Sequence, residues 1–171
     1  MALIKPLLGK VPDFGRDCFT AETAVIIGDV KMGDYCSIWY GAVIRGDVHY
    51  IRMGNYVNIQ DNAVVHATYK RSPTNIGNYV SVAHNAIIHG CTIHDRVLVG
   101  MGAIVMDDAE IGSDSIIAAG AVVTKGTVVP PGSIYAGNPA KLLRPIDQVM
   151  LDGEVERIAK SYKKYASWYL P

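Results

Sequence analysis

Residues 97–123 read VLVGMGAIVMDDAEIGSDSIIAAGAVV, and a large apolar residue returns at every sixth position. These positions are held by Val99, Val105, Ile111, Ile117 and Val123. The residue two places before each of them is Val, Ala or Ser, so a small side chain recurs with the same period. An α-helix repeats its apolar residues at 3.6-residue spacing, and a half-buried strand repeats them at every second residue. A six-residue period is therefore typical of a repeat architecture.

The same period extends over most of the chain. The large apolar position is occupied in turn by Phe14, Thr20, Ile26, Met32, Ile38, Ile44, Met53, Ile59, Val65, Ile76, Val82, Ile88, Ile93, Val99, Val105, Ile111, Ile117, Val123 and Val129. Three hexads make one coil of about 18 residues, and coils of short parallel strands stack at about 4.8 Å. β-branched side chains suit an extended backbone and would fill the interior. The sequence predicts an all-β solenoid, a parallel β-helix over about residues 11–140 of a single domain, 1–171.

The six-residue period ends after residue 140, and residues 146–169 have the pattern of a helix. Val155, Ile158, Ala159 and Tyr162 lie at helical spacing and form an apolar stripe. We expect this C-terminal α-helix to lie along the solenoid or against a neighbouring chain. Gly153 marks the point at which we expect it to divide into two pieces.

The repeat changes register at three places. The interval 44–53 contains three extra residues, the interval 65–76 contains five, and the interval 88–93 is one residue short. All three changes fall in the third hexad of a coil, so they gather on one edge of the solenoid. Because solenoids often bind ligands where such irregularities gather, this edge is the candidate functional site.

Composition excludes several classes of function. The chain has 16 basic and 16 acidic residues and a formal net charge of +0, which argues against a nucleic-acid or anionic-membrane partner. It contains no apolar run long enough to span a membrane, and Pro6 interrupts the N-terminal apolar segment, so we expect no signal peptide. Three cysteines without a CxxC motif fit a reducing compartment, and we expect a cytoplasmic protein.

The register also assigns places to the histidines of the stretch SVAHNAIIHG, residues 81–90. Arg45, His66 and His89 each occupy the second position of the third hexad in successive coils, so they form one column. His84 lies in the second hexad, directly above Asp61, and the chain from His84 to His89 covers up to about 16 Å. A metal binds imidazole nitrogens at about 2.0–2.1 Å. His66 and His89 could therefore share one metal, which His84 would join most easily from a neighbouring chain.

This histidine set has two interpretations. Three neutral imidazoles with an open water position are the pattern of a catalytic zinc site. The alternative is a set of surface histidines on a solenoid that binds no metal. The remaining histidines, His49 and His94, are not part of the predicted set.

Three segments carry a resemblance to a known family. VIRGD (43–47), NIQDNAVVH (58–66) and VAHNAIIHG (82–90) resemble the signature of the gamma-class carbonic anhydrases, over nearly the whole chain. The resemblance implies a left-handed β-helix and a homotrimer that hydrates carbon dioxide to bicarbonate. It also implies that His66, His84 and His89 bind the metal between subunits, with His84 contributed across the interface. Imidazole ligands suit Zn²⁺, and Fe²⁺ or Co²⁺ equally.

The resemblance assigns further roles residue by residue. Arg45 and Asp47 match residues that form ion pairs at the subunit interface, a role that bidentate geometry suits. Gln60 matches a glutamine that hydrogen-bonds the metal-bound water or the substrate. Asp61 matches an acidic residue behind the metal ligands or at the interface. Tyr162 resembles a tyrosine that reaches the site in short homologues.

The sequence also departs from the best-studied member of the family. Val48 stands where that enzyme has a glutamate, and the inserted segment ATYKRSPT (67–74) contains no carboxylate. An acidic proton shuttle is therefore missing, and we expect low hydratase activity. Tyr162 and His49 are the candidates for relaying protons in its place.

Two other classes of function stay open. The segment AGNPAK (136–141) also ends many hexapeptide acyltransferases, in which a histidine acts as general base without a metal. His84 or His94 could be that base for an acyl-CoA substrate. The other class is a catalytically silent metal-binding accessory or scaffold subunit.

Overall fold

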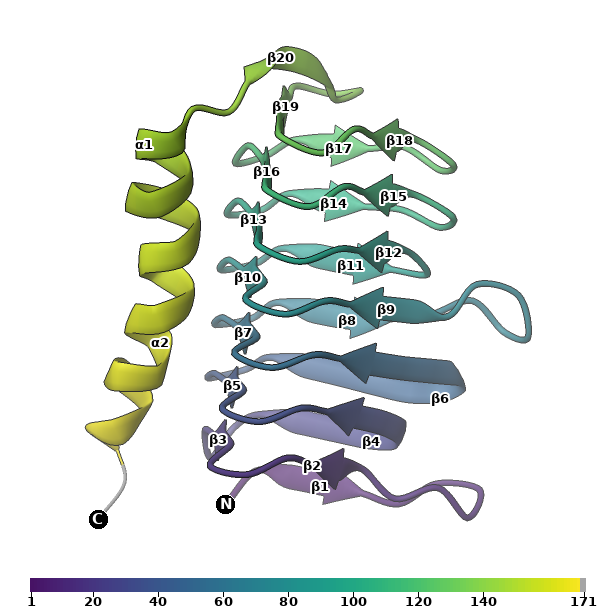
Figure 1. The fold of residues 1–171 in the computed structure, drawn as a ribbon. Coiled ribbons are helices and arrows are strands. Elements are labelled where there is room, and N and C mark those ends of the chain that lie inside the picture. The colour runs from purple at the N-terminus through teal and green to yellow at the C-terminus, as the bar shows by residue number, and fades with distance from the viewer. Residues whose placement is uncertain (170–171) are drawn as a thin grey trace.

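The computed structural model describes residues 1–169, and residues 170–171 of the predicted domain lie outside the described part. The chain forms a parallel β-solenoid with one helix along its side (Figure 1). The strands are β1 (Leu3–Lys5), β2 (Asp13–Phe14), β3 (Phe19–Thr20), β4 (Val25–Met32), β5 (Ser37–Ile38), β6 (Val43–Met53), β7 (Asn58–Ile59), β8 (Val64–His66), β9 (Thr74–Ile76), β10 (Ser81–Val82), β11 (Ile87–His89), β12 (Thr92–Ile93), β13 (Val97–Val99), β14 (Ile104–Val105), β15 (Glu110–Ile111), β16 (Ser115–Ile117), β17 (Val122–Val123), β18 (Val128–Val129), β19 (Ser133–Ala136) and β20 (Lys141–Pro145). The predicted hexapeptide-repeat solenoid is confirmed.

The coils form three ladders of parallel strands. One ladder runs β6-β8-β11-β14-β17, and a second runs β6-β9-β12-β15-β18. The long strands β4 and β6 continue around the corner between these two faces and join them into one sheet. The third ladder, β3-β5-β7-β10-β13-β16-β19, ends in the antiparallel strand β20. The solenoid begins at β1, earlier than residue 11, because Leu3–Lys5 pairs with Val25–Ile27 of β4.

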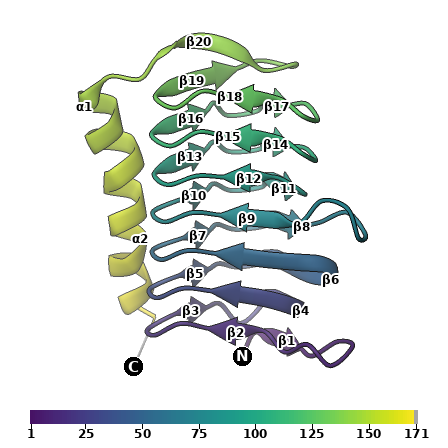
Figure 2. The ribbon, with the colours of Figure 1, turned by 45° about the vertical axis from the view of Figure 1, so that its right-hand side comes forward.

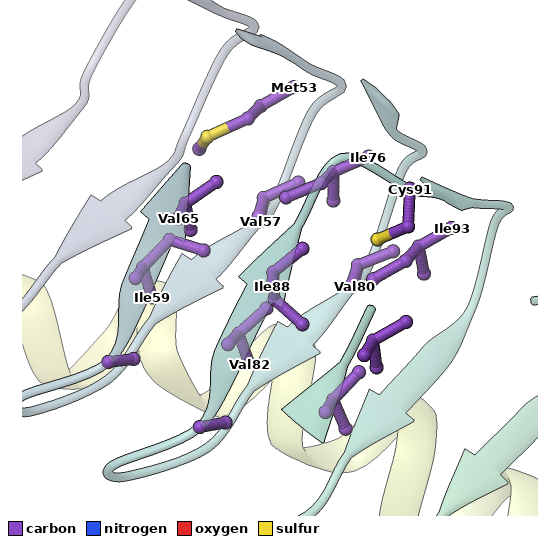
Figure 3. Packing of buried hydrophobic residues seen from close by; sticks show 14 of the residues in the cluster. Met53, Val57, Ile59, Val65, Ile76, Val80, Val82, Ile88, Cys91 and Ile93 are labelled. Atoms are coloured by element: carbon purple, nitrogen blue, oxygen red, sulfur yellow. The ribbon is translucent and has the colours of Figure 1, made fainter. Parts of the chain in front are cut away.

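The large apolar positions of the hexads fill the interior in vertical stacks (Figure 3). One stack follows the strand register through Ile26, Ile44, Val65, Ile88, Val105 and Val123, and all six side chains have no solvent exposure. Burying such a side chain contributes about 1.5–3 kcal/mol. The core therefore runs the length of the solenoid and holds each coil in register with its neighbours.

The C-terminal helix is continuous and does not divide at Gly153. It consists of α1 (Gln148–Met150), a π-helical segment η1 (Leu151–Glu156) and α2 (Arg157–Ser167). The Asp147 side chain accepts a hydrogen bond from the Met150 N–H and caps the helix N-terminus. Gly153 lies inside the π-helical segment, where the Arg157 N–H donates to the Asp152 carbonyl. The wider turn absorbs an additional residue, so the predicted break becomes a local widening.

The helix lies along the third ladder (Figures 1 and 2). Val155 is fully buried against Ile116 and Ile134 of the solenoid, and Ala166 is buried in a cluster with Phe19 and Trp39. Of the two predicted positions of this helix, along the solenoid or against a neighbouring chain, it takes the first. No helix within residues 1–169 is long and apolar enough to cross a membrane.

The three register changes lie on the edge away from the helix (Figure 1). The first lies within β6, and the second is the loop 67–73 between β8 and β9, which protrudes from the solenoid. The third is the short turn from β11 to β12, residues 90–91. The predicted clustering of the irregularities on one edge is confirmed. The strands that contain Arg45, His66 and His89 lead to this edge.

Candidate metal centre

Two imidazole rings meet at the ends of β8 and β11. His66 and His89 are direct partners in the parallel ladder, as the hexad register predicts. His66 Nδ1 lies 3.0 Å from His89 Nε2. Two nitrogens bound to one tetrahedral zinc would lie about 3.3 Å apart. The spacing of the two rings thus fits a shared metal with only a small adjustment.

Each ring of this pair is held from behind by a carboxylate. His66 Nε2 lies 3.0 Å from Asp47 Oδ1, and His89 Nδ1 lies 2.6 Å from Asp107 Oδ1. An ionised carboxylate only accepts hydrogen bonds, so the proton of each neutral ring lies on the nitrogen that faces the aspartate. The two inner nitrogens then present lone pairs to each other across 3.0 Å. That arrangement is repulsive unless a cation or a shared proton lies between the rings.

Arg45 completes the column beneath His66. Its guanidinium forms an ion pair with Asp47 Oδ2, while Oδ1 of the same carboxylate binds His66. Burial would raise the pKa of Asp47, but hydrogen bonds from Arg45 and His66 outweigh it and lower that pKa. Burial also lowers the pKa of His66, and the Arg45 charge acts in the same direction. His66 is therefore held in the neutral form, which is the form that binds metals.

His84 lies apart from this pair within one chain. It stands above Asp61, as the register predicts, and its Nδ1 is 2.8 Å from Asp61 Oδ2. The proton of a neutral ring then lies on Nδ1, which leaves the Nε2 lone pair free, as in His89, whereas in His66 the free lone pair is on Nδ1. Within the described residues, no group of three or more His, Cys, Asp or Glu side chains converges on one point. One chain therefore contains two separate parts of the predicted ligand set.

A cavity of about 400 Å³ lies beside His84, between the solenoid and the C-terminal helix. Gln60, Tyr162 and Met101 are among its lining residues. The Gln60 side chain is buried, and its amide nitrogen donates to Asn58 Oδ1 at 2.9 Å. That bond fixes the amide orientation and leaves the carbonyl oxygen as an acceptor.

Tyr162 packs edge-on against Trp39 and lies near Asp61. Burial, together with the negative charge of Asp61, raises the pKa of Tyr162 to about 12. The phenol therefore keeps its proton at neutral pH and acts as a hydrogen-bond donor. Gln60, Asp61, His84 and Tyr162 thus gather on the helix side of the chain, while Arg45, Asp47, His66 and His89 gather on the edge with the irregularities.

The other two histidines have different surroundings. His49 Nδ1 accepts a hydrogen bond from the Tyr50 N–H, and the ring lines a cavity of about 310 Å³ that also includes Asp47 and Lys70. His49 is thus on the side of the His66–His89 pair and does not share a cavity with Tyr162. His94 Nε2 pairs with Glu110 at 2.8 Å on the solenoid surface.

Asp107 is a site residue that the sequence reasoning missed. It follows Met106, which comes one coil after His89 in the same column. The signal available in the sequence is the acidic pair Asp107–Asp108, which lies one coil beyond the histidines on the irregular edge. Which ring the carboxylate meets depends on side-chain geometry, which the hexad register does not specify.

This chain is similar to a known protein family and to several known proteins. The family model for bacterial transferase hexapeptide (six repeats) matches residues 90–125. "Gamma carbonic anhydrase 2, mitochondrial" of Arabidopsis thaliana is 44% identical over 161 residues, which are 91% of this chain but 56% of that protein. The chain therefore spans little more than half the length of this relative.

Two further relatives match this chain over almost their whole length. A carbonic anhydrase of Geobacillus kaustophilus is 40% identical over 167 residues, covering 98% of this chain and 91% of that protein. The crystal structure of a hexapeptide transferase family protein from Anaplasma phagocytophilum is 41% identical, with a TM-score of 0.93 and coverage of 98% of both chains. The chain is thus similar to proteins named for two different activities on one fold.

Proposed function

The chain belongs to the family of the gamma carbonic anhydrases, and we propose that it hydrates carbon dioxide to bicarbonate. In this proposal a homotrimer holds the metal between its subunits. His66 and His89 of one chain and His84 of the next are the ligands. The relatives named carbonic anhydrase support the reaction class, and the arrangement of the histidines supports the metal.

One observation carries the proposal. His66 Nδ1 and His89 Nε2 face each other at 3.0 Å, and the outer nitrogen of each ring is bonded to an aspartate. His84 has the same arrangement with Asp61. Carboxylates behind metal-binding histidines fix the ring tautomer and raise the basicity of the ligating nitrogen. A bound divalent cation would supply a Lewis acid that makes water nucleophilic at neutral pH.

The two halves of the site also explain the proposed assembly. The His66–His89 pair lies on the irregular edge, whereas His84 lies beside the C-terminal helix. A cyclic trimer is built from head-to-tail contacts, in which one surface of a subunit meets a different surface of the next. Such a contact would bring the irregular edge of one chain against the His84 side of its neighbour. The side chains of Ile87 and Met101 are exposed and available to such an interface: Ile87 lies in β11 with His89, and Met101 lines the cavity beside His84.

The other residues of the site have roles that follow from their contacts. Asp47, held by Arg45, orients the His66 ring and places its proton on Nε2, while burial and the Arg45 charge keep the ring neutral. The Gln60 carbonyl oxygen is the acceptor for an O–H group in the cavity beside His84, because its amide nitrogen is bonded to Asn58. The Tyr162 phenol donates a hydrogen bond to an anionic oxygen, since its raised pKa rules it out as a base at neutral pH.

Metal analysis coupled to a carbon dioxide hydration assay tests this proposal. Protein purified without chelators should contain stoichiometric Zn²⁺, Fe²⁺ or Co²⁺ and should accelerate hydration. The variant His89→Ala should lose most of the metal and the activity, while the solenoid remains folded because its core does not include this side chain. Unchanged metal content in His89→Ala would contradict the ligand assignment.

An acyl-CoA-dependent transferase is the second candidate. The cavity beside His84 includes the apolar side chains Leu98, Met101 and Ile116, and the His84–Asp61 pair has the arrangement of an oriented general base. The similarity to a hexapeptide transferase family protein points the same way. Binding of coenzyme A without bound metal would favour this candidate. Stoichiometric metal without turnover of either substrate would favour an accessory subunit.

A further inference from the structure

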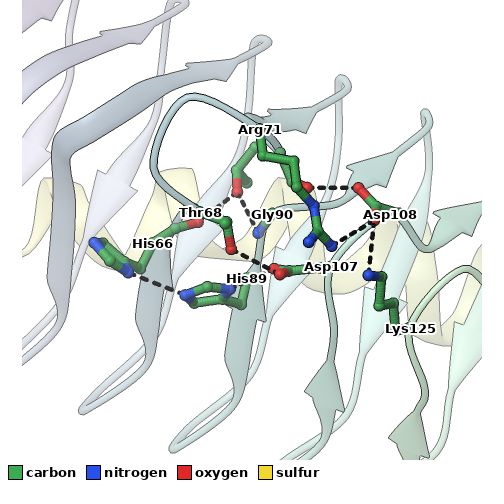
Figure 4. Close-up of polar contacts among 10 residues, drawn as sticks. His66, Thr68, Arg71, His89, Gly90, Asp107, Asp108 and Lys125 are labelled. Atoms are coloured by element: carbon green, nitrogen blue, oxygen red, sulfur yellow. Dashed lines mark hydrogen bonds and ion pairs between the residues drawn. The ribbon is translucent and has the colours of Figure 1, made fainter.

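The Asp107 carboxylate bridges the metal centre and the inserted loop (Figure 4). Its Oδ1 lies 2.6 Å from His89 Nδ1, and its Oδ2 accepts a hydrogen bond from the Thr68 hydroxyl at 2.7 Å. Thr68 is the second residue of the loop 67–73, the segment in which the repeat has five extra residues. One carboxylate thus has one oxygen committed to the loop and the other committed to the ring of His89.

The inserted loop makes further contacts with the solenoid besides the hydrogen bond from Thr68 to Asp107. Ser72 Oγ donates to Asp108 Oδ1 at 2.5 Å, and Arg71 pairs with Asp108 Oδ2 at 3.2 Å. Just beyond the loop, Thr74 Oγ1 donates to the His66 carbonyl and accepts from the Gly90 N–H. The bonds to Asp108 attach the loop to the coil that carries Asp107, and the bonds of Thr74 attach the end of the loop to β8 and to the turn after β11.

Gly90 provides the space that the Asp107 carboxylate occupies. A Cβ atom at this position would overlap Asp107 Oδ1 and would lie only 3.0 Å from the Ser72 Cβ. The Gly90 φ angle of +57° is also a conformation that L side chains rarely adopt. The missing side chain after His89 therefore allows a carboxylate of the next coil to reach the ring.

The electrostatics of Asp107 agree with this geometry. Burial would raise its pKa, but hydrogen bonds from Thr68 and His89 outweigh burial and lower it. The carboxylate is therefore ionised at neutral pH and accepts hydrogen bonds from both partners. An ionised Asp107 requires the His89 proton on Nδ1, which leaves Nε2 with its lone pair toward His66.

We propose that Asp107 is the positioning residue that makes Nε2 the ligating nitrogen of His89, and that the loop 67–73 supports it through the Thr68 hydroxyl. This inference rests on the proposed metal site. It gives the five-residue insertion a function, because the insertion supplies the donor that holds the second carboxylate oxygen. Partners of this kind change metal affinity by about 10- to 100-fold when they are removed from metal sites.

The first measurement reads the His89 tautomer in metal-free protein. Long-range ¹H–¹⁵N spectra of ¹⁵N-histidine-labelled protein at pH 8 distinguish a ring protonated on Nδ1 from one protonated on Nε2. We expect wild-type His89 to be protonated on Nδ1 only. In Asp107→Asn, whose amide can donate as well as accept, we expect a mixture of tautomers. An unchanged single tautomer in Asp107→Asn would overturn the proposal.

The second measurement is the dissociation constant for Zn²⁺, obtained by competition with a chromophoric chelator. Asp107→Asn should raise it about 10- to 100-fold. Thr68→Val, which removes the hydroxyl and keeps the shape, should raise it by a smaller factor, and Thr68→Ser should restore the wild-type value. Ser72→Ala is the matched control, because it removes a loop contact to Asp108 and should leave the constant within about twofold.

The two measurements separate this inference from the proposed function. If wild-type protein bound no metal, the proposed function would fail, while the tautomer of His89 would still report whether Asp107 orients the ring. If Thr68→Val matched wild type in both measurements, the role of the loop would be refuted. If Ser72→Ala weakened metal binding as much as Thr68→Val, the loop would act only as a structural cover. Circular dichroism and thermal unfolding verify that each variant is folded.

Discussion

Two variants that lose the metal separately should recover part of it when they are assembled together. His66→Ala removes a ligand on the irregular edge and leaves His84 intact. His84→Ala removes the ligand beside the helix and leaves the His66–His89 pair, whose nitrogens lie 3.0 Å apart. Within residues 1–169 these ligands do not converge on one point, so each variant disables a different half of the site.

The size of the expected recovery follows from the geometry of a cyclic trimer. Each junction joins the irregular edge of one subunit to the His84 side of the next, in a fixed order. In a trimer that contains both variants, one junction of the three combines the intact pair with an intact His84. Random mixing of equal amounts places both variants in about three-quarters of the trimers, so about a quarter of all sites should be restored.

The assay is refolding followed by metal analysis. The two variants are unfolded, mixed in equal amounts and refolded with Zn²⁺, and bound metal is measured after removal of free ions. Native mass spectrometry confirms that mixed trimers have formed. The matched control mixes His66→Ala with His89→Ala, which damage the same half, so that no junction is intact and no metal should return.

Metal retention no better than that of the separately refolded variants would refute the reasoning, provided that mixed trimers are present. That result would place all three ligands in one chain. It would also overturn the hexad register, because the register separates His84 from His89 by the length of one side of the solenoid.

Three other outcomes are expected from the contacts described above. Because the carboxylates near the histidines are engaged as hydrogen-bond acceptors, proton release should limit turnover. Imidazole buffer should then raise kcat in a stopped-flow hydration assay without changing kcat/KM. A high activity that does not depend on the buffer would reveal an internal proton shuttle. The pKa values of Asp47 and Asp107 are lowered in the fold, so the unfolded chain binds more protons below the ordinary aspartate value of about 3.9. Their stabilising effect should be complete above that pH and lost as the pH falls through the lowered values, and urea unfolding at pH 3 compared with pH 5 measures it, with Asp47→Asn expected to flatten the dependence. The exposed Lys163 of α2 lies over the Tyr35 ring at 3.8 Å, so Lys163→Ala should lower the free energy of unfolding by about 0.5–1 kcal/mol. Lys164→Ala, at the next exposed position of the same helix, should change it little.

A large part of the site could be predicted because the position of a residue in the hexad repeat determines which residues of the neighbouring coils lie beside it. Once Ile or Val occupies every sixth position, burial of that side chain forces each coil into register with the last. The adjacency of His66 and His89, the position of His84 above Asp61 and the clustering of the insertions on one edge all follow from counting. The C-terminal helix was predictable for a similar reason, since its apolar stripe has helical spacing.

The tertiary structure decided what depends on side-chain geometry and on irregular backbone. The sequence by itself determined the solenoid, its core and the column of histidines, because these depend on a repeated pattern of burial that one-dimensional spacing describes completely. It did not determine that Asp107 would bind His89, because this contact requires the path of the loop 67–73 and the space left at Gly90. The continuity of the helix through Gly153 was likewise decided by packing, since burial of Val155 against the solenoid favours a widened turn over a break.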